Sequence, residues 1–395
     1  MLAITNARLV TVTGGVIEQG TVIVEDGKIR AVGDAASLSV LEGATIVDGT
    51  GKTLMPGMID VTTRLGLRED GSGPAGYDDT ELASPTTPHL RALDGINPED
   101  LALADARESG VTAVGVVPGS YPVVAGTAAV IKTAGITVED MTLIDDWALR
   151  VSIAGTPRMY AMFGGGKPRA RSDEAAILLK ELQRAKDHLD SRELKEEGGE
   201  VDEDAPPPKL APYVRLLKGE CPALMQVVGN HDIANALEIA DEWGFSVVLD
   251  KATEAHLAVD LLKGSGVGVV VGPIMINRRG ESRNTSLRTP AVLAEAGVNC
   301  ALTTDHPTIP IDFLAVQAAT AVRDGMTEED AVKAITINPA RILGLEKRLG
   351  SLEQGKDADL VLLSGHPFAI DTQVLKVWID GEPVYELKEE GGPLC

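Results

Sequence analysis

Short runs of apolar, mostly β-branched residues alternate with helical stretches through the middle of the chain. Eight such runs lie at residues 57–62, 112–117, 128–132, 149–154, 223–228, 246–251, 267–271 and 299–305. Helical patterns occur at residues 173–189, 231–243, 254–263, 290–295, 313–324 and 327–337. This alternation is the signature of βαβ units, and eight strands is the number that a TIM barrel needs. We therefore predict an α/β fold built on a (β/α)8 barrel.

Both ends of the chain have a different pattern, which is typical of antiparallel strands. Apolar and polar side chains alternate at residues 2–11, 16–25, 28–33, 359–363, 374–379 and 384–385. Asp26-Gly27 and Asp380-Gly381 lie between such segments, and this dipeptide is a strong hairpin signal. We expect the two ends to assemble into one small β-domain.

These patterns divide the chain into two predicted domains. Residues 1–55 and 347–395 would form a composite β-sandwich, and residues 56–346 the barrel. An acidic, proline-rich insertion at residues 190–212 contains Pro206-Pro207-Pro208 and has too few apolar residues to order itself. We predict a solvated loop or an extended helix end there, with a lid over the barrel mouth as the alternative.

Composition limits the partners of the chain. The net charge of −23 over 395 residues repels phosphate backbones and anionic membrane surfaces, so we expect no nucleic acid and no membrane among its partners. No apolar run reaches the length of about 20 residues that crosses a bilayer. The three cysteines are far apart, and the N-terminus has no signal-peptide pattern. We therefore expect a reducing, cytoplasmic location.

Sequence motifs add a family resemblance to this outline. They are LMPGMIDVTTRLG at residues 54–66, LTTDHP at 302–307, AVKAITINPARILGL at 331–345 and GSLEQGKDADLV at 350–361. With the β-rich N-terminal segment, these motifs resemble the amidohydrolase superfamily in order and across nearly the whole chain. The stretch TPHLRALDGINP at residues 87–98 is similar to imidazolonepropionase-like and dipeptidase-like members.

The resemblance implies metal-assisted hydrolysis of C–N bonds, in which an aspartate on strand eight takes a proton from metal-bound water. The family's other ligands are His-x-His on strand one, sometimes a carboxylated lysine or a glutamate on strand four, and one histidine each on strands five and six. This sequence has Thr62 and Arg64 on strand one, no histidine ending strand five, and Lys251 on strand six. Only Asp305 remains, as a remnant general base. Hydroxyl and guanidinium groups do not replace imidazole on zinc, so we expect a degenerate site with no metal and no cofactor.

A weakly bound divalent metal is the alternative for this region. An oxygen-rich set that suits Mg²⁺ or Mn²⁺ would consist of Asp250, Glu254, Asp305 and His306. Arg64 and Lys251 would lie beside that cation, and their charges oppose its binding.

The same cationic side chains suggest two uses of the barrel mouth. Arg64 and Lys251 would form a salt-bridge cluster with Asp305 that fills the space, or the surplus charge of +1 would bind a small anionic ligand. Further candidates for ligand binding are Thr62, His306, and Arg279 and Arg283 of an arginine-rich loop after strand seven.

Three functions remain open at this point. The first is a pseudoenzyme of the amidohydrolase fold that binds a small anion or has a regulatory role. The second is a hydrolase of C–N bonds, in non-peptide or dipeptide amides, with Asp305 as general base. The third is a structural subunit. Because members of such families assemble, we expect a homo-oligomer, a dimer before other states.

Overall fold

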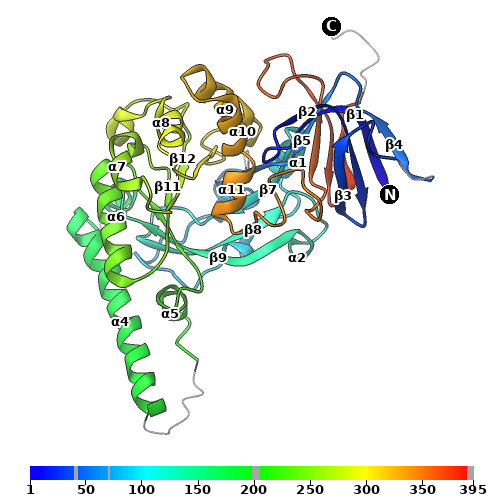
Figure 1. Ribbon diagram of the computed structural model, residues 1–395. Coiled ribbons are helices and arrows are strands. Elements are labelled where there is room, and N and C mark those ends of the chain that lie inside the picture. Colours follow the sequence, from blue (N-terminus) through cyan, green and yellow to red (C-terminus); the bar gives the residue numbers. More distant parts are fainter. Residues whose placement is uncertain (40–42, 70–71, 165, 198–204, 389–395) are drawn as a thin grey trace.

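A computed structural model describes residues 1–39, 43–69, 72–164, 166–197 and 205–388, and all eight apolar runs of the middle region are strands in it. They form one nearly closed, barrel-like sheet of order β13-β12-β11-β10-β9-β8-β7-β6 (Figure 1). The strands are β6 (Met58–Thr63), β7 (Val111–Val116), β8 (Val124–Lys132), β9 (Thr142–Ser152), β10 (Ala223–Gln226), β11 (Val247–Asp250), β12 (Gly268–Val271) and β13 (Cys300–Leu302). Every residue of β6, β7, β10 and β11 is buried, as expected for strands covered on both faces.

The third strand departs from the predicted (β/α)8 pattern. β8 pairs antiparallel with both β7 and β9, whereas the other neighbours in the sheet pair in parallel. Only residues 117–123 connect β7 to β8, and a parallel crossover needs a dozen residues or more. The prediction of a uniform (β/α)8 barrel is therefore wrong at this strand.

The sheet closes between β6 and β13 through side chains rather than through a ladder of backbone hydrogen bonds. The Asp60 carboxylate on β6 accepts hydrogen bonds from Thr304 N–H at 2.8 Å, Thr304 Oγ1 at 2.6 Å and Thr303 Oγ1 at 2.5 Å. Arg64 N–H donates to the His306 carbonyl at 3.0 Å. Asp60 thus joins the two edge strands at the point where the barrel would otherwise be open.

The structure describes eleven helices. They are α1 (Leu101–Glu108), α2 (Val138–Met141), α3 (Gly155–Gly164), α4 (Arg171–Glu197), α5 (Ala211–Leu217), α6 (Asn230–Trp243), α7 (Val259–Leu262), α8 (Thr289–Glu295), α9 (Leu314–Arg323), α10 (Glu328–Ala334) and α11 (Ile337–Ile342). Helices α6, α8 and α11 are among those that pack on parallel strands of the sheet, whereas α2 packs on β8. Short 3-10 turns are η1 (Gly73–Gly76), η2 (Ala92–Gly95), η3 (Ala255–Leu257), η4 (Gly280–Asn284) and η5 (Ile311–Phe313).

Two of the predicted helices are divided in the structure. The segment 254–263 forms η3 and α7, which are separated at Ala258. In the segment 327–337, α10 ends at Ala334 and α11 begins after Thr336. The Ile335 carbonyl lies at this break and accepts a hydrogen bond from Ile59 N–H of β6 at 2.8 Å, so the interruption ties the helix to the barrel.

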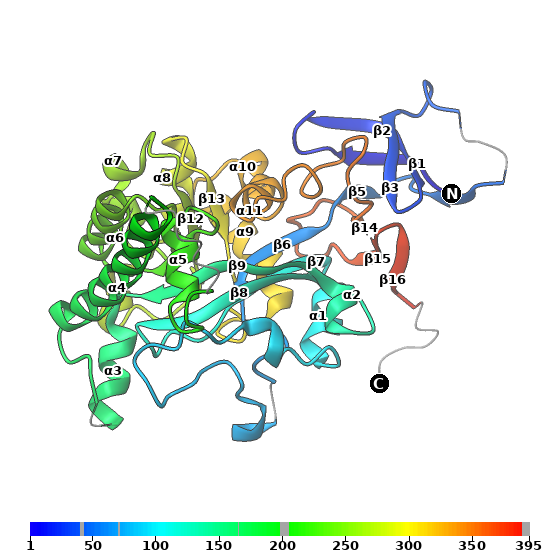
Figure 2. The ribbon, with the colours of Figure 1, turned by 90° about the horizontal axis from the view of Figure 1, so that it is seen from below.

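Strands from both ends of the chain share a second sheet. Its strands are β1 (Leu2–Val10), β2 (Val16–Glu25), β3 (Lys28–Asp34), β4 (Thr45–Asp48), β5 (Thr53–Pro56), β14 (Leu360–Leu363), β15 (Val374–Ile379) and β16 (Glu382–Glu386). The order is β16-β15-β14-β5-β1-β2-β3, with β4 beside β1, and the sheet lies at one end of the barrel (Figures 1 and 2). This is one continuous sheet, so the predicted β-sandwich is not confirmed. The boundaries at residues 1–55, 56–346 and 347–395 stay a prediction.

The second sheet has an apolar core of its own. Twelve buried residues form it, among them Ile4, Val24, Leu54, Leu360 and Trp378. The core joins side chains from both ends of the chain, which explains why neither end can complete this unit alone.

The predicted insertion at residues 190–212 begins as a helix. Residues 190–197 continue α4, which runs away from the barrel in Figure 1, whereas residues 198–204 lie outside the described part of the chain. The extended helix end therefore fits residues 190–197 better than a lid does. Among the helices that the structure describes, none has both the length and the apolar character needed to cross a membrane.

Candidate functional site

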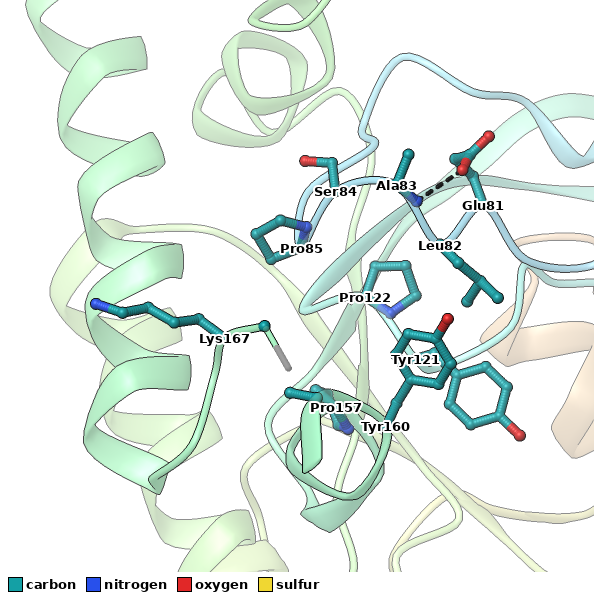
Figure 3. Close-up of a pocket in the computed structure, with 12 residues that line it drawn as sticks. Glu81, Leu82, Ala83, Ser84, Pro85, Tyr121, Pro122, Pro157, Tyr160 and Lys167 are labelled. Atoms are coloured by element: carbon teal, nitrogen blue, oxygen red, sulfur yellow. Dashed lines mark hydrogen bonds between the residues drawn. The ribbon is translucent and has the colours of Figure 1, made fainter. Parts of the chain in front are cut away.

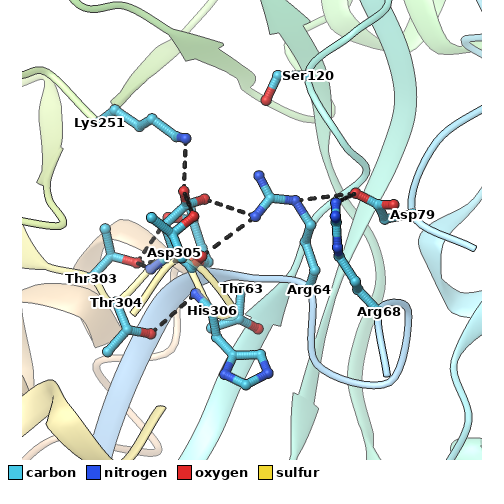
Figure 4. Close-up of polar contacts among 12 residues, drawn as sticks. Thr63, Arg64, Arg68, Asp79, Ser120, Lys251, Thr303, Thr304, Asp305 and His306 are labelled. Carbon is cyan, nitrogen blue, oxygen red and sulfur yellow. Dashed lines mark hydrogen bonds and ion pairs between the residues drawn. The ribbon is translucent and has the colours of Figure 1, made fainter. Parts of the chain in front are cut away.

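Asp305 lies at the centre of the barrel mouth, directly after the last barrel strand, and is 1% exposed. Its Oδ2 accepts hydrogen bonds from Lys251 Nζ at 2.7 Å and from Thr308 Oγ1 at 2.8 Å. On the other side, Arg64 Nη1 lies 3.2 Å from Oδ1 (Figure 4). The structure thus brings together the three residues that the sequence placed at the mouth, with one cation on each carboxylate oxygen.

The backbone at two of these residues is in an uncommon conformation. Lys251 has φ of +64° and Asp305 has φ of +49°, the left-handed region that non-glycine residues seldom adopt. Such residues cost on the order of 1–3 kcal/mol each and concentrate at functional sites. These two residues, which follow β11 and β13, form the Lys251–Asp305 ion pair.

Opposing effects set the pKa of Asp305. Burial raises the pKa, but the charges of Arg64 and Lys251, with the hydrogen bonds from Lys251 and Thr308, lower it by more. The net pKa is below its ordinary value, so the carboxylate is ionised at neutral pH.

Arg64 is shared between two carboxylates. Its Nε lies 3.3 Å from Asp79 Oδ2, on the side away from Asp305. Arg68 Nη1 lies 3.7 Å from the same oxygen, and its guanidinium stacks over the Tyr77 ring at 4.3 Å. Burial lowers the pKa of Arg64, but the charges of Asp305 and Asp79 raise it by more, which keeps the side chain charged.

A glycine allows the Asp79 loop to approach the barrel. Gly119 N–H donates a hydrogen bond to the Asp79 carbonyl at 2.7 Å. A Cβ atom at Gly119 would lie 1.8 Å from Thr80 Oγ1, so any other residue would push this loop away. The Asp79–Arg64 contact therefore depends on Gly119.

A second ion pair lies deeper in the barrel. Arg150 on β9 is 1% exposed, and its Nη1 is 2.6 Å from Asp250 Oδ2 at the end of β11. Its Nη2 donates to Gln226 Oε1 at 3.1 Å and to Ser120 Oγ at 3.2 Å. Thr62 Oγ1 donates to Asp250 Oδ1 at 3.0 Å. Thr62 is therefore part of this inner network rather than of the cavity wall.

Asp60 is the third buried carboxyl of the barrel. Burial raises its pKa to about 6, although hydrogen bonds from Thr303 and Thr304 act in the opposite direction. In the part of the chain that the structure describes, the Asp60 carboxylate accepts hydrogen bonds but pairs with no cation, in contrast to Asp305 and Asp250.

A cavity of about 330 Å³ opens above the Asp305 cluster. Its lining is Arg64, Arg68, Asp79, Ser120, Tyr121, Thr156, Met159, Lys251, Pro307 and Thr308. Three cations line it against one carboxylate, and Asp305 beneath adds a second negative charge, which leaves a surplus of +1. Such a cavity is suited to a small molecule that carries negative charge.

Three other predicted site residues lie outside this cavity. The His306 ring points away from the Asp305 carboxylate (Figure 4). Arg279 and Arg283 are exposed at η4 and neither lines the cavity. The cavity as the structure has it therefore does not include these two arginines, and their role in ligand binding stays a prediction.

Sequence reasoning missed three charged residues of the site. Arg150 interrupts an apolar run at the fourth strand, where the family sometimes has a lysine, and this interruption was a usable signal. Asp79 and Arg68 belong to a long loop without periodicity, so nothing in the sequence placed them beside Arg64.

The residues at the strand ends do not fit the divalent metal that the resemblance implies. Arg64, Arg150 and Lys251 occupy the region as cations, and Asp250 and Asp305 are each held in an ion pair. Glu254, of the alternative oxygen-rich set, instead accepts from Asn230 N–H at 2.9 Å and Asn284 Nδ2 at 2.6 Å. Among the residues that the structure describes, no group of three or more His, Cys, Asp and Glu side chains could hold a metal ion. A dication at this place would have to displace these cations first.

Known proteins are similar to this chain in both sequence and fold. The profile of the Amidohydrolase family matches residues 251–385. A crystal structure of an amidohydrolase from Thermotoga maritima superposes with a TM-score of 0.94 and 38% identity, over 98% of this chain and 100% of that one. An imidazolonepropionase from Sphingopyxis alaskensis is 25% identical over 91% of this chain and 90% of its own length.

A further relative is much longer than this chain. The amidohydrolase tasK of Hapsidospora irregularis is 26% identical over 93% of this chain, but the match spans only 40% of tasK. From the fold, the motifs and these relatives together, the chain belongs to the amidohydrolase superfamily.

Proposed function

We propose that this protein is a metal-independent member of its superfamily that binds a small carboxylate at the barrel mouth and does not hydrolyse C–N bonds. One observation carries the proposal. Asp305, at the position of the superfamily's base, is engaged on both oxygens by Arg64 and Lys251 beneath a cavity with surplus positive charge. A regulatory or structural role for the liganded protein would follow from such binding.

The chemistry of Asp305 supports the absence of hydrolysis. A general base needs a pKa near the working pH and a lone pair that faces the water it activates. The pKa of Asp305 is lowered by its two cationic neighbours. Its Oδ2 already accepts hydrogen bonds from Lys251 and Thr308, and Arg64 Nη1 lies 3.2 Å from Oδ1. Proton abstraction by Oδ2 would first require that one of its contacts break.

The free donors at the mouth favour a carboxylate as the ligand. Arg64 Nε faces the Asp79 carboxylate, and Nη1 faces that of Asp305. Its Nη2 forms no hydrogen bond to any residue in the described part of the chain. Lys251 uses one of its three N–H donors on Asp305. Arginine and lysine that share an anion bind it through charge-assisted hydrogen bonds, the stronger kind.

The relatives favour a second candidate function. Their names include amidohydrolase and imidazolonepropionase, so a C–N hydrolase that retains Asp305 as general base is the alternative. A weakly bound divalent metal would belong to that alternative. We also expect a homodimer, which light scattering of the purified protein would test.

The test combines metal analysis, hydrolysis assays and anion binding. We expect bound Zn, Mn, Fe and Ni far below one ion per chain by mass spectrometry, no turnover of amide, dipeptide or cyclic-imide substrates, and acetate binding by calorimetry. Arg64→Gln should abolish acetate binding, whereas Arg283→Gln, a matched exposed arginine, should leave it unchanged. Stoichiometric metal with turnover that is lost in Asp305→Ala would establish the hydrolase instead.

A further inference from the structure

A second cavity of about 250 Å³ lies next to the mouth cavity and shares three lining segments with it. The loop at residues 79–85, the turn at 120–122 and helix α3 contribute to both cavities. Tyr121 lines both cavities, and Figure 3 shows it on the wall of the second one. The two cavities are therefore neighbouring compartments, with Tyr121 in the lining of each.

The second compartment differs from the first in chemistry. Its wall is rich in rings: Pro85, Pro122, Pro157, Tyr121 and Tyr160. The Tyr121 and Tyr160 ring centroids are 5.0 Å apart, within the range of a favourable aromatic contact. Flat apolar faces of this kind take up rings or short hydrocarbon chains.

Charge at the second compartment does not favour another anion. Glu81 lies on its wall, and its carboxylate accepts a hydrogen bond from Ala83 N–H at 2.7 Å (Figure 3). Lys167 lies on the wall as well and is exposed, so the charges of Glu81 and Lys167 offset each other. Surplus positive charge is confined to the mouth, where Arg64, Arg68 and Lys251 gather.

The volumes of the two cavities also favour one ligand that occupies both. Small-molecule sites usually have volumes of roughly 300–1,000 Å³, so the mouth cavity alone accepts only a small ligand. At about 250 Å³, the second cavity is smaller than most independent sites but sufficient for one ring or short chain.

Helix α3, which lines both compartments, is held in place by the loop that contains η4. Glu281 of η4 accepts from Gly155 N–H, at the start of α3, at 3.0 Å, and from Arg158 Nη2 at 3.1 Å. The loop after β12 thus contributes through its glutamate, which anchors α3, rather than through Arg279 and Arg283.

From these observations we infer that the ligand is an elongated monocarboxylate, with its carboxylate at Arg64 and Lys251 and an apolar, ring-bearing arm that passes Tyr121 into the second compartment. This inference rests on the proposed function, since it presumes that the mouth binds a carboxylate. It adds a ligand class and assigns Tyr160 to recognition of the arm.

Calorimetry with acetate and 4-phenylbutanoate on the full chain tests the inference. Burial of the arm should make 4-phenylbutanoate bind at least about tenfold more tightly than acetate. Tyr160→Ala should remove most of this advantage and leave acetate binding unchanged. Tyr385→Ala, a tyrosine of the second sheet, is the matched control and should alter neither affinity.

A second variant guards against misfolding of Tyr160→Ala. Ser84 is half-buried on the loop side of the second compartment, and Ser84→Trp should fill that space and remove the advantage of 4-phenylbutanoate. If both carboxylates bind equally to the wild type, or if neither variant reduces the advantage, the inference is wrong and the proposed function stands. If neither carboxylate binds, the proposed function itself is wrong.

Discussion

At the barrel mouth, two cations flank one buried carboxylate, whereas at the opposite end one buried lysine lies among three carboxylates. Lys132, the last residue of β8, is 4% exposed. Its Nζ is 3.0 Å from Asp357, 3.0 Å from Asp359 and 2.7 Å from Asp380. These aspartates belong to the C-terminal part of the second sheet, so Lys132 fastens that sheet to the barrel.

The base cluster is balanced in charge. Asp357 also pairs with Lys28 and with Arg348, so three cations match three anions. These cations lower the pKa of Asp357 to about 2, although burial acts to raise it. At the mouth, by contrast, the cluster keeps a surplus of +1 beside a cavity.

The contrast suggests that the two charged clusters have different roles, stability at the base and ligand binding at the mouth. The Lys132 cluster is neutral in sum, with Lys132, Asp357 and Asp359 buried, and so has no charge left with which to attract a ligand. Lys251 is 20% exposed, and the mouth cluster is satisfied only in part by the protein itself. Stability should therefore depend more on the base, and ligand binding on the mouth.

The largest expected effect is at the base. Lys132→Met leaves Asp357, Asp359 and Asp380 without their central cation, and removal of one partner from a buried ion pair costs about 3–5 kcal/mol. Urea unfolding at pH 7.5 measures the loss in free energy of unfolding. A loss below about 1 kcal/mol would mean that Lys132 does not hold the second sheet, and would break the comparison.

The pH dependence of stability should reveal two buried carboxyls of similar pKa, Asp60 between the edge strands of the barrel and Asp359 in the base cluster. Burial raises the pKa of Asp60 to about 6, and burial outweighs Lys132 to raise that of Asp359 to about 6. In the unfolded chain both carboxyls lose their protons near pH 4, so the folded state binds more protons between pH 4 and 6. Stability should therefore fall as pH rises through this window, by up to about 3 kcal/mol for each group.

Asparagine variants separate these two contributions. Asp60→Asn and Asp359→Asn should each flatten the decline in unfolding free energy between pH 4.5 and 7.5. Only Asp60→Asn should raise stability at pH 7.5, because Asp359 is a partner of Lys132 at 3.0 Å, whereas Asp60 has no cationic partner among the residues that the structure describes. The exposed Asp371→Asn is the control. An unchanged slope in Asp60→Asn would show that its carboxyl titrates normally.

A smaller effect is expected for the matching lysine at the mouth. Lys251→Met leaves Asp305 with Arg64 at 3.2 Å and Thr308 at 2.8 Å, so we expect a loss of only about 1–2 kcal/mol. Acetate binding should decrease at the same time. Urea unfolding and calorimetry on the same preparation measure both quantities. If Lys251→Met destabilises the protein as much as Lys132→Met does, the proposed division of roles is wrong.

The positions of strands and of the central cluster could be predicted because they depend on local pattern. Apolar runs located all eight barrel strands, and the ends of three of them placed Arg64, Lys251 and Asp305 together. The direction of β8 was missed, although the predicted runs at 112–117 and 128–132 left only residues 118–127 between them, fewer than the dozen that a parallel crossover needs.

Other parts of the site depend on contacts that no local pattern encodes. Asp79 reaches Arg64 because its loop packs closely on Gly119, which is 40 residues further along the chain. Whether Arg150 points into the barrel depends on the register of β9, and a shift of one residue would reverse it. Such long-range placements required the folded chain.

The smallest expected effect concerns the arginines that the sequence assigned to the mouth. Arg279 and Arg283 are exposed, and only Glu281 between them contacts α3. Arg279→Gln with Arg283→Gln should thus change stability by less than about 0.5 kcal/mol and leave acetate affinity unchanged. Glu281→Gln, in the same loop, should weaken 4-phenylbutanoate more than acetate, because it loosens the helix that forms the second compartment. A clear loss of acetate binding in the double arginine variant would show that this loop belongs to the binding site at the mouth. The contrast between the mouth and the base would then be weaker.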